Sequence, residues 1–399
     1  MSETIYDVVV IGGGPAGATA ADDMARKGLR VFLLDRAGRI KPCGGAIPPR
    51  AIMDFNIPDS QLVARVTSAR MIAPSDRIVD MPVGEGYVGM VDRAVFDEFL
   101  RERAAKSGAT RATGSFERIS REGGTTLVHY FAGRERDTSQ PATVRTRCVI
   151  GADGARSSVA KQEIKGGDKV KCVFAYHEIV VAPQNDNLVR DYDPLRCDVY
   201  YQGKMSPDFY SWIFPHGDSV SIGTGTLHKG FSIRGAVAEL RQTTGLDKME
   251  TIRREGAPIP LKPLKRWDNG RDVLVCGDAA GVVAPASGEG IYYAMACGRL
   301  AADAAISFLA TGDARELATA RKRFMKEHGR VFMILGVMQY FWYANDRRRE
   351  RFVKMCMDKD VQRLTWESYM HKRLVKREKK AQFKIFLKDM AHLLGFATT

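Results

Sequence analysis

The sequence predicts an α/β protein with a Rossmann-like nucleotide-binding domain, an inserted antiparallel-sheet domain of α+β character and a helical C-terminal region. Residues 5–35 read as a strand, a glycine-rich turn, a helix and a second strand. Residues 172–225 contain short runs that alternate apolar and polar side chains, which is the pattern of an antiparallel sheet. From about residue 290 onward, helical spacing dominates the chain.

The turn after the first strand carries the sharpest signal. An apolar strand, Ile5–Ile11, leads directly into Gly12-Gly13-Gly14-Pro15-Ala16-Gly17. In such a turn Gly12 allows the tight bend, Gly14 lets the backbone approach a pyrophosphate, and Gly17 lets helix and strand pack closely. The pyrophosphate is then held at the positive N-terminus of the helix.

The second strand, Arg30–Leu34, ends on Asp35. In this position a carboxylate holds a ribose hydroxyl of the dinucleotide. Glycine-rich turns also occur by chance, but here strand, loop, helix, strand and acid come in the required order. The sequence therefore predicts a dinucleotide site, although the loop does not say which dinucleotide it holds.

The later elements follow from the same rules. Residues 93–107 show helical spacing, and Asp92 is placed to cap that helix. Residues 112–146 read as strands and turns, and an apolar strand ends in Ala152-Asp153-Gly154. The strands expected in the inserted sheet are Val173–Val181, Asp198–Gln202, Phe209–Phe214 and Val220–Gly225.

The order of these elements predicts a discontinuous nucleotide-binding domain. It comprises residues 1–75, 90–170 and 265–315, and the antiparallel substrate domain, 171–264, interrupts it. A basic helical region, 316–399, follows. The full length of 399 residues is enough for two or three such units around a substantial core.

Composition narrows the class of protein. Apolar and charged residues make up 45% and 27% of the chain, as in an ordinary globular protein. The seven cysteines form no CxxC pair, so neither a metal site nor a disulfide framework is expected. No basic and apolar leader precedes the first strand, and no uninterrupted apolar run reaches the roughly 18–20 residues that span a bilayer. These features predict a cytoplasmic protein.

A second anchor far along the chain indicates which dinucleotide is bound. A buried-type strand, Asp272–Cys276, ends in Gly277-Asp278, and a helix of small residues runs from about Gly290 to Leu309. Asp278 can bind the ribityl or phosphate part of a long cofactor such as FAD, whereas a simple NAD enzyme does not usually need such an anchor. The alternative is an ordinary strand-to-helix turn with a capping Asp.

Several ordered motifs resemble those of the para-hydroxybenzoate-hydroxylase-like FAD enzymes. They are the first loop, Asp92-Arg93, Gly151–Ser157 and Gly277–Ala280, and together they span about the first 300 residues. The resemblance implies Arg93 near the pyrophosphate, Asp278 near the ribityl chain and Gly288–Ile291 beside the flavin ring. The residues thereby expected to bind FAD are Gly12, Gly14, Pro15, Ala16, Gly17, Asp35, Arg36, Cys43, Gly44, Gly45, Ala46, Arg93, Asp153, Gly277, Asp278, Gly288, Gly290 and Ile291.

Within that group the chain is similar to the geranylgeranyl reductases. Tyr210–Pro215, followed after seven residues by Gly223-Thr224-Gly225, fits the family pattern YxWxFP…GxG, and Lys41–Gly45 matches the family's cysteine loop. The likeness to members that act on chlorophyll or bacteriochlorophyll side chains extends into Leu364–Tyr369. The resemblance implies FAD as cofactor, NADPH as electron donor and a geranylgeranyl substrate, although no second GxGxxG unit is visible for NADPH.

Tyr210, Trp212 and Phe214 are expected to share one face of their strand, because side chains alternate with period two. Three large aromatic residues on one face form either a core or one wall of an apolar slot. With an FAD site nearby, and with Gly223 and Gly225 making room, we favour a substrate slot.

Saturation of an isolated alkene needs a hydride on one carbon and a proton on the other. The expected catalytic residues are Cys43, Tyr210 and Trp212, with Cys43, Tyr210 or a bound water as the proton donor. His177 and His216 are further candidates, although a lone histidine is more often a hydrogen-bonded structural residue.

Most of the net positive charge lies near the end of the chain. Residues 321–399 contain 20 Lys and Arg against 8 Asp and Glu, whereas the remainder contains 41 against 39. An apolar run, 331–343, precedes Arg347-Arg348-Arg349, and a basic stretch follows from Lys372 to Lys388. The run is a core helix beside a solvated surface, or it docks on an anionic membrane, which we favour. Nucleic-acid binding is not expected, because no recognition motif accompanies the charge.

The sequence thus predicts an FAD-dependent, NADPH-driven reductase that converts geranylgeranyl to phytyl on the diphosphate or on the pigment. It is expected at the cytoplasmic face of a photosynthetic membrane, with other pigment-biosynthesis enzymes as possible partners. The alternatives are a flavin monooxygenase of an apolar substrate and a non-catalytic prenyl carrier on the same fold. The retained cofactor residues Asp35 and Asp278 argue against the carrier.

Overall fold

The computed structural model forms two compact units, each built from three segments of the chain. The first unit contains residues 1–43, 92–174 and 256–337, and the second contains 44–91, 175–255 and 338–399. The structure describes residues 4–36, 41–134, 140–184, 189 and 191–372.

The first unit is built on a six-stranded sheet. Five strands are parallel in the order β8-β2-β1-β10-β16, and β9 is antiparallel to both β8 and β10. This is the expected Rossmann-like order, in which β1 lies in the centre and the glycine turn follows it. The strands are β1 (Ile5–Ile11), β2 (Val31–Asp35), β8 (Thr110–Glu122), β9 (Thr125–Ala132), β10 (Gln140–Gly151) and β16 (Val273–Val275).

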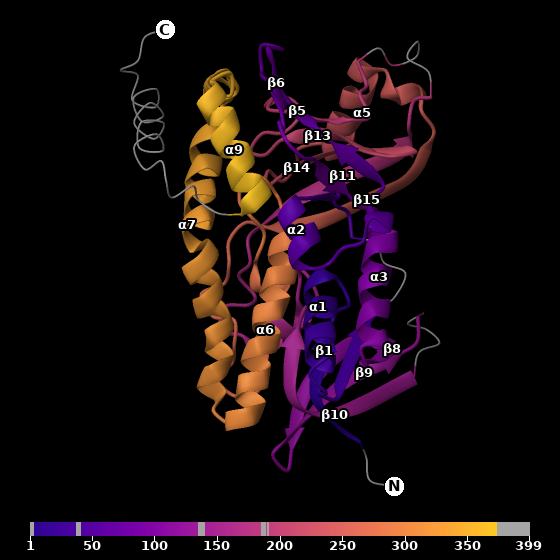
Figure 1. Cartoon of the computed structure of the whole chain (residues 1–399), viewed down its shortest axis with the longest axis vertical. Helices are drawn as coiled ribbons and strands as arrows, with labels where there is room; N and C mark the ends of the chain where they lie inside the picture. Colours follow the sequence, from indigo (N-terminus) through magenta and orange to yellow (C-terminus); the bar gives the residue numbers. More distant parts are fainter. Residues whose placement is uncertain (1–3, 37–40, 135–139, 185–188, 190, 373–399) are drawn as a thin grey trace. The chain divides into compact units, whose positions relative to one another are not determined.

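Small residues let the helices of this unit approach closely. Figure 1 shows α6 beside α1, and a Cβ added at Gly298 of α6 would lie 2.2 Å from the carbonyl oxygen of Ala16. Asp92 caps α3 as predicted, because its side chain accepts the N–H of Ala94 at 2.7 Å. The helices are α1 (Pro15–Ala25), α3 (Arg93–Lys106), α4 (Ser158–Glu163), η3 (Gly277–Ala280), α6 (Ile291–Thr311), η4 (Ala314–Ala318) and α7 (Thr319–Trp342), whose last residues belong to the second unit.

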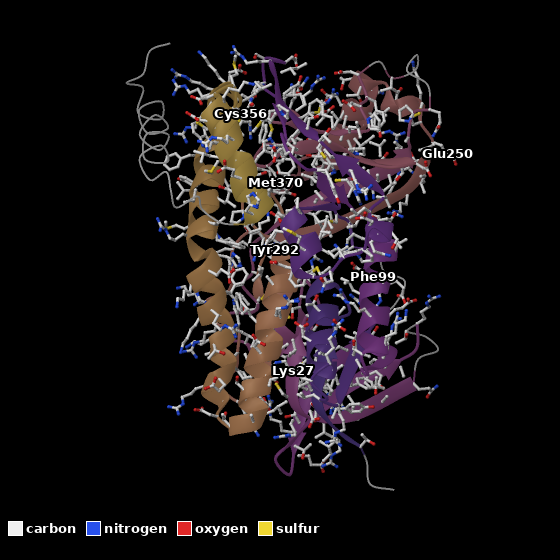
Figure 2. All side chains as sticks on the ribbon, in the orientation of Figure 1. Lys27, Phe99, Glu250, Tyr292, Cys356 and Met370 are labelled. Carbon is white, nitrogen blue, oxygen red and sulfur yellow. The ribbon has the colours of Figure 1, made fainter. Side chains whose placement is uncertain are left out.

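Aromatic side chains join α6 to α7. The Tyr293 ring lies 5.0 Å from that of Phe332 and 5.3 Å from that of His328, and Figure 2 marks the neighbouring Tyr292 on α6. By length and composition α6 could cross a membrane, yet half of its apolar window is buried within the protein. This burial is typical of a core helix.

The second unit is built on a seven-stranded sheet in the order β15-β11-β14-β13-β12-β5-β6. The pairs β12–β13 and β13–β14 are antiparallel as predicted, but β12 is parallel to β5, so the sheet is mixed. Its strands are β5 (Ser68–Ile72), β6 (Ile78–Pro82), β11 (Cys172–Val181), β12 (Arg196–Tyr200), β13 (Ser211–His216), β14 (Ser219–Thr226) and β15 (Thr251–Pro260).

Smaller elements complete this unit. A three-stranded sheet has the order β3-β7-β4, with β3 at Ala46–Ile47, β4 at Ala64–Val66 and β7 at Val88–Met90. The helices are α2 (Pro49–Asp54), η1 (Asp59–Gln61), α5 (Ile233–Thr244), η2 (Leu246–Lys248), α8 (Asp346–Met355) and α9 (Lys359–His371). The described part of the C-terminal region is therefore helical, as expected, and the basic stretch after Lys372 lies outside the described residues.

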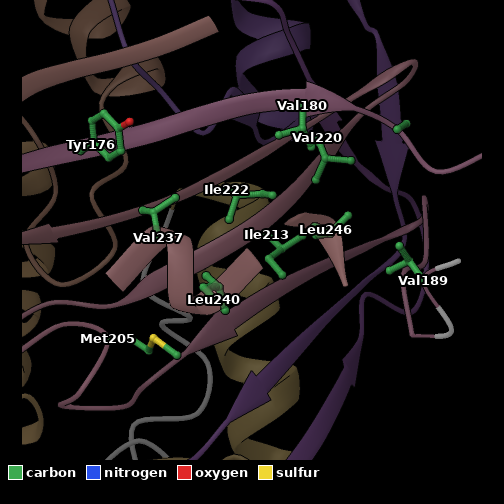
Figure 3. Packing of buried hydrophobic residues seen from close by; sticks show 11 residues of the cluster. Tyr176, Val180, Val189, Met205, Ile213, Val220, Ile222, Val237, Leu240 and Leu246 are labelled. Atoms are coloured by element: carbon green, nitrogen blue, oxygen red, sulfur yellow. The ribbon is translucent and has the colours of Figure 1, made fainter. Parts of the chain in front are cut away.

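The two faces of the large sheet carry different sets of side chains. On one face, Ile213, Val220 and Ile222 pack with Val237 and Leu240 of α5, and Figure 3 shows this cluster. Because side chains alternate along a strand, the residues between them must lie on the opposite face. The face that carries Tyr210, Trp212 and Phe214 is therefore the one that α5 leaves uncovered.

The unit boundaries differ from the predicted domains. Residues 44–75 were assigned to the nucleotide-binding domain, but they belong to the second unit, because β5 pairs with β12. Residues 316–337 belong to the first unit, where α7 packs on α6, rather than to a separate C-terminal region. Strand pairing between distant segments depends on register, which no local pattern reveals.

Candidate active site

The glycine turn after β1 forms a cradle of backbone. Gly12 has φ +107°, and a Cβ there would lie 2.3 Å from the carbonyl oxygen of Ala152. A Cβ at Gly17 would lie 1.9 Å from the carbonyl oxygen of Gly12. At Gly14, by contrast, a Cβ would meet no heavy atom within 4 Å. The turn is thus pressed against β10 and α1 but open at Gly14, the position where a pyrophosphate approaches.

Asp35 and a residue that sequence reasoning missed hold this turn in place. Asp35 accepts the backbone N–H of Gly13 through Oδ2 at 2.8 Å. Arg101 of α3 donates to the carbonyl oxygen of Gly13 at 3.3 Å, and its Nη1 lies 3.7 Å from Oδ1 of Asp35. The sequence carries no local signal for this contact, because Arg101 and Gly13 lie 88 residues apart.

The second cofactor anchor packs directly on the first. A Cβ at Gly277 would lie 2.7 Å from the Cβ of Ala16, so η3 touches α1 next to the glycine turn. Asp278 reaches the start of α6, since its Oδ1 would be 4.0 Å from a Cβ at Gly290. The structure therefore brings Gly277, Asp278 and the Gly288–Ile291 segment to the first loop.

Lys41 is an ion-pair partner of Asp278 that sequence reasoning did not identify. Its ammonium group donates to Oδ2 of Asp278, whose side chain is nearly buried. In the sequence, Lys41 stands out only as the first residue of the cysteine loop. The pair connects that loop to the second anchor across 237 residues of sequence.

Two predicted cofactor residues make other contacts in the structure. Asp153 accepts the N–H of Ser158 at 2.7 Å and the hydroxyl of Ser157, so its carboxylate caps α4, and burial raises the pKa of Asp153. Arg93 is buried and makes two 2.7 Å bonds to the carboxylate of Asp97. Burial alone would lower the pKa of Arg93, but Asp97 and the Cys43 thiol raise it.

The remaining predicted cofactor residues are spread over both units. Arg36 follows β2 and is exposed, while Pro15 and Ala16 form the first turn of α1. Ala46 lies in β3 and packs on the apolar cluster of Met90 and Met370. Assignment of these residues to the cofactor remains a prediction.

Taken together, the first-unit residues fit FAD. The open Gly14 position and the first turn of α1 offer backbone amides, which a helix leaves without intrahelical acceptors, to a pyrophosphate. Asp35 ends β2 beside the glycine turn, and Asp278 lies beside the start of α6, so both carboxylates are available to polar groups of such a cofactor.

An aromatic row lies on the face of the large sheet opposite α5, in the second unit. The rings of Tyr210 and Trp212 are 6.0 Å apart, and those of Trp212 and Phe214 are 6.2 Å apart. The prediction that these three residues share a face is confirmed, although Tyr210 lies just before β13. Tyr210 and Phe214 are half-buried, whereas Trp212 is 6% exposed.

The cysteine loop meets one end of this row. A Cβ at Gly44 would lie 2.8 Å from the ring of Phe214, and one at Gly45 would lie 2.5 Å from Nε2 of His216. Only glycine permits this approach, because any side chain would displace the aromatic residues. Gly44 and Gly45 therefore pack directly against Phe214 and His216, and Cys43 immediately precedes them in the chain.

Gly223 makes room for the side chain of Trp212. A Cβ at Gly223 would lie 2.2 Å from Cζ2 of Trp212, so the indole occupies the place of the missing side chain. A contact of Gly223 with substrate remains a prediction. Gly225 offers its carbonyl oxygen to the hydroxyl of Ser206 at 2.7 Å. His177 is buried and hydrogen-bonded to Ser221 and Glu255, which agrees with a structural histidine.

The comparisons with known proteins agree with this geometry. Residues 6–182 match the family model described as pyridine nucleotide-disulphide oxidoreductase. The geranylgeranyl diphosphate reductase of Rhodobacter capsulatus is 59% identical over 98% of both chains. The chloroplastic geranylgeranyl diphosphate reductase of Arabidopsis thaliana is 39% identical over 92% of this chain and 80% of its own.

A solved structure shows the same fold. The geranylgeranyl bacteriochlorophyll reductase-like protein of Thermoplasma acidophilum superposes with a TM-score of 0.80 at 21% identity, covering 99% of this chain and 98% of that one. The glycine turn and the second anchor, Gly277-Asp278, together with these matches define the class of protein. It is a flavoprotein oxidoreductase that binds FAD. Within that class, the chain belongs to the geranylgeranyl reductase family.

Proposed function

We propose that this protein is an FAD-dependent reductase that saturates the geranylgeranyl chain to phytyl, using electrons from NADPH. The carrying observation is the aromatic row Tyr210–Trp212–Phe214, which ends against Gly44 beside Cys43. An apolar wall of aromatic rings suits an extended hydrocarbon, which carries no charge for the protein to bind. The geranylgeranyl reductase relatives support the same substrate, and they do not favour a monooxygenase.

The chemistry divides between cofactor and protein. When bound and reduced, FAD supplies the hydride. The chain's own residues orient the alkene and exclude water, and they hold an acid that supplies the proton to the second carbon. Our candidates for this acid are Tyr210, a member of the aromatic row, and Cys43, the residue before Gly44, whose thiol is hydrogen-bonded to Arg93, itself held by Asp97.

The proposal predicts a defined product. Purified protein incubated anaerobically with NADPH should convert geranylgeranyl diphosphate or geranylgeranyl bacteriochlorophyll into species heavier by one H₂ for each saturated bond, as measured by mass spectrometry. Because a monooxygenase needs oxygen, anaerobic turnover separates the two activities. Product that appears only in air, with a mass gain of one oxygen, would contradict the reductase.

We further propose that the protein works on the cytoplasmic face of a photosynthetic membrane, where pigment-biosynthesis partners would be found. The apolar run 331–343 forms the end of α7 and the residue after it, and its side chains are divided between two environments. Phe332 and Trp342 are buried, whereas Met333 and Tyr340 are 63% and 78% exposed. Exposed apolar residues followed by arginines suit an anionic lipid surface.

Flotation with anionic liposomes tests this location. The wild-type protein should float at low salt and less at high salt, because each nearby Lys or Arg adds about 1 kcal/mol of screened attraction. A Met333→Ser/Tyr340→Ser double variant should float less. Met53→Ser, which changes a 61% exposed methionine on α2, is the control. Absence of wild-type binding at low salt would rule out the membrane surface.

A further inference from the structure

A chain of hydrogen bonds crosses four neighbouring strands of the large sheet and ends on Trp212. Glu255 of β15 lies 2.8 Å from Nε2 of His177 on β11. Nδ1 of that ring lies 2.9 Å from Oγ of Ser221 on β14, and the same Oγ accepts the indole N–H of Trp212 at 3.1 Å. His177, Ser221 and Trp212 are buried, so water does not compete for these bonds.

With an ionised carboxylate and a neutral imidazole, only one assignment of protons satisfies every donor and acceptor in this chain of hydrogen bonds. A carboxylate only accepts, so His177 donates from Nε2 to Glu255, whose other oxygen lies 3.4 Å from Nε of Arg253. In a neutral imidazole Nδ1 then accepts the hydroxyl proton of Ser221. The lone pairs of that hydroxyl are left to accept the indole N–H, which fixes the edge of the ring.

Packing holds the faces of the same indole. Trp212 pairs directly with Gly223 across the strands, and its ring occupies the place of the missing side chain. A Cβ at Gly223 would also lie 2.7 Å from the Cβ of His177, so the histidine closes the space beyond the indole. Trp212 is therefore held at its face by packing and at its N–H by the hydrogen-bond chain.

We infer that Glu255, His177 and Ser221 are positioning residues that hold Trp212, the middle member of the aromatic row. The inference rests on the proposed function, because it makes the row a wall for a prenyl chain. Apolar packing alone resists displacement of the indole weakly along the wall, whereas a hydrogen bond specifies one orientation. Loss of the hydrogen bond to the indole should misplace the double bonds of the prenyl substrate relative to the reacting centre.

Ser221→Ala is the direct test, and Ser219→Ala on the same strand is its control. In Ser221→Ala the indole ¹⁵N–¹H resonance of Trp212, identified with Trp212→Phe among the four tryptophans, should shift. The rate of alkene reduction should fall roughly tenfold, the scale of one lost buried hydrogen bond, and incompletely reduced prenyl products should accumulate. Ser219→Ala should change neither, and both variants should retain FAD.

Changes at Glu255 give a second, independent readout. Glu255→Gln keeps an oxygen that can accept from His177, so it should preserve the resonance and the product pattern, whereas Glu255→Ala should reproduce Ser221→Ala. An unmoved indole resonance in both Ser221→Ala and Glu255→Ala would overturn the inference even if the enzyme reduces geranylgeranyl normally. A shifted resonance in a protein whose wild type reduces no geranylgeranyl substrate would instead overturn the proposed function.

Discussion

Gly17→Ala is expected to yield protein without bound flavin and with a greatly lowered melting temperature. The added methyl would lie 1.9 Å from the carbonyl oxygen of Gly12, so α1 must move away from the turn. Backbone cannot yield as a side chain does, and we expect a destabilisation of about 3 kcal/mol or more. Visible flavin absorbance and thermal unfolding of the purified variant measure the two effects.

Gly14→Ala provides the matched comparison within the same turn. Its added methyl meets no protein atom within 4 Å, and its φ of −73° suits any residue. The apoprotein should therefore keep its stability, while the methyl group obstructs the pyrophosphate and lowers the occupancy of FAD. If Gly14→Ala bound FAD like the wild type, the pyrophosphate would not approach the turn at this glycine.

Removal of the proton donor should have the second large effect. Cys43→Ser and Tyr210→Phe each remove one candidate acid, and the variant that lacks the true donor should reduce the alkene about 100-fold more slowly. Reduction of the flavin by NADPH should continue, since that step does not use the acid. Single-turnover measurements of flavin reduction and of product formation separate the two steps.

Tyr130→Phe, which removes a hydroxyl from β9 in the first unit, is the control for the tyrosine change. It should leave both steps at the wild-type rate. Full alkene reduction by both Cys43→Ser and Tyr210→Phe would exclude these residues as the acid and direct attention to a bound water.

Features that depend on neighbours along the chain were predictable from the sequence. The strand before Gly12 has its expected bounds, a helix follows the glycine turn as predicted, and Asp92 caps α3. The shared face of Tyr210, Trp212 and Phe214 also follows, because a two-residue period requires no knowledge of the partner strand. In each case the pattern and the structure it specifies lie within a few residues.

Features that depend on distant partners were not predictable. Arg101 was not identified from the sequence, because its partner Gly13 lies 88 residues away. The neighbour of Gly223 is likewise set by the register of β13 and β14, which places Trp212 opposite it. The residues around a glycine or an arginine in the sequence do not identify its contact partner, because several different neighbours could fill the same position.

The sequence by itself determined the class of cofactor and the family, through motifs whose spacing is read along the chain. Only the tertiary structure decided how these motifs combine. It joined Lys41 to Asp278, seated Gly44 against Phe214 and connected Glu255 through His177 and Ser221 to Trp212. The physical reason is that a buried polar group needs a partner, and strand order and register choose which distant residue provides it.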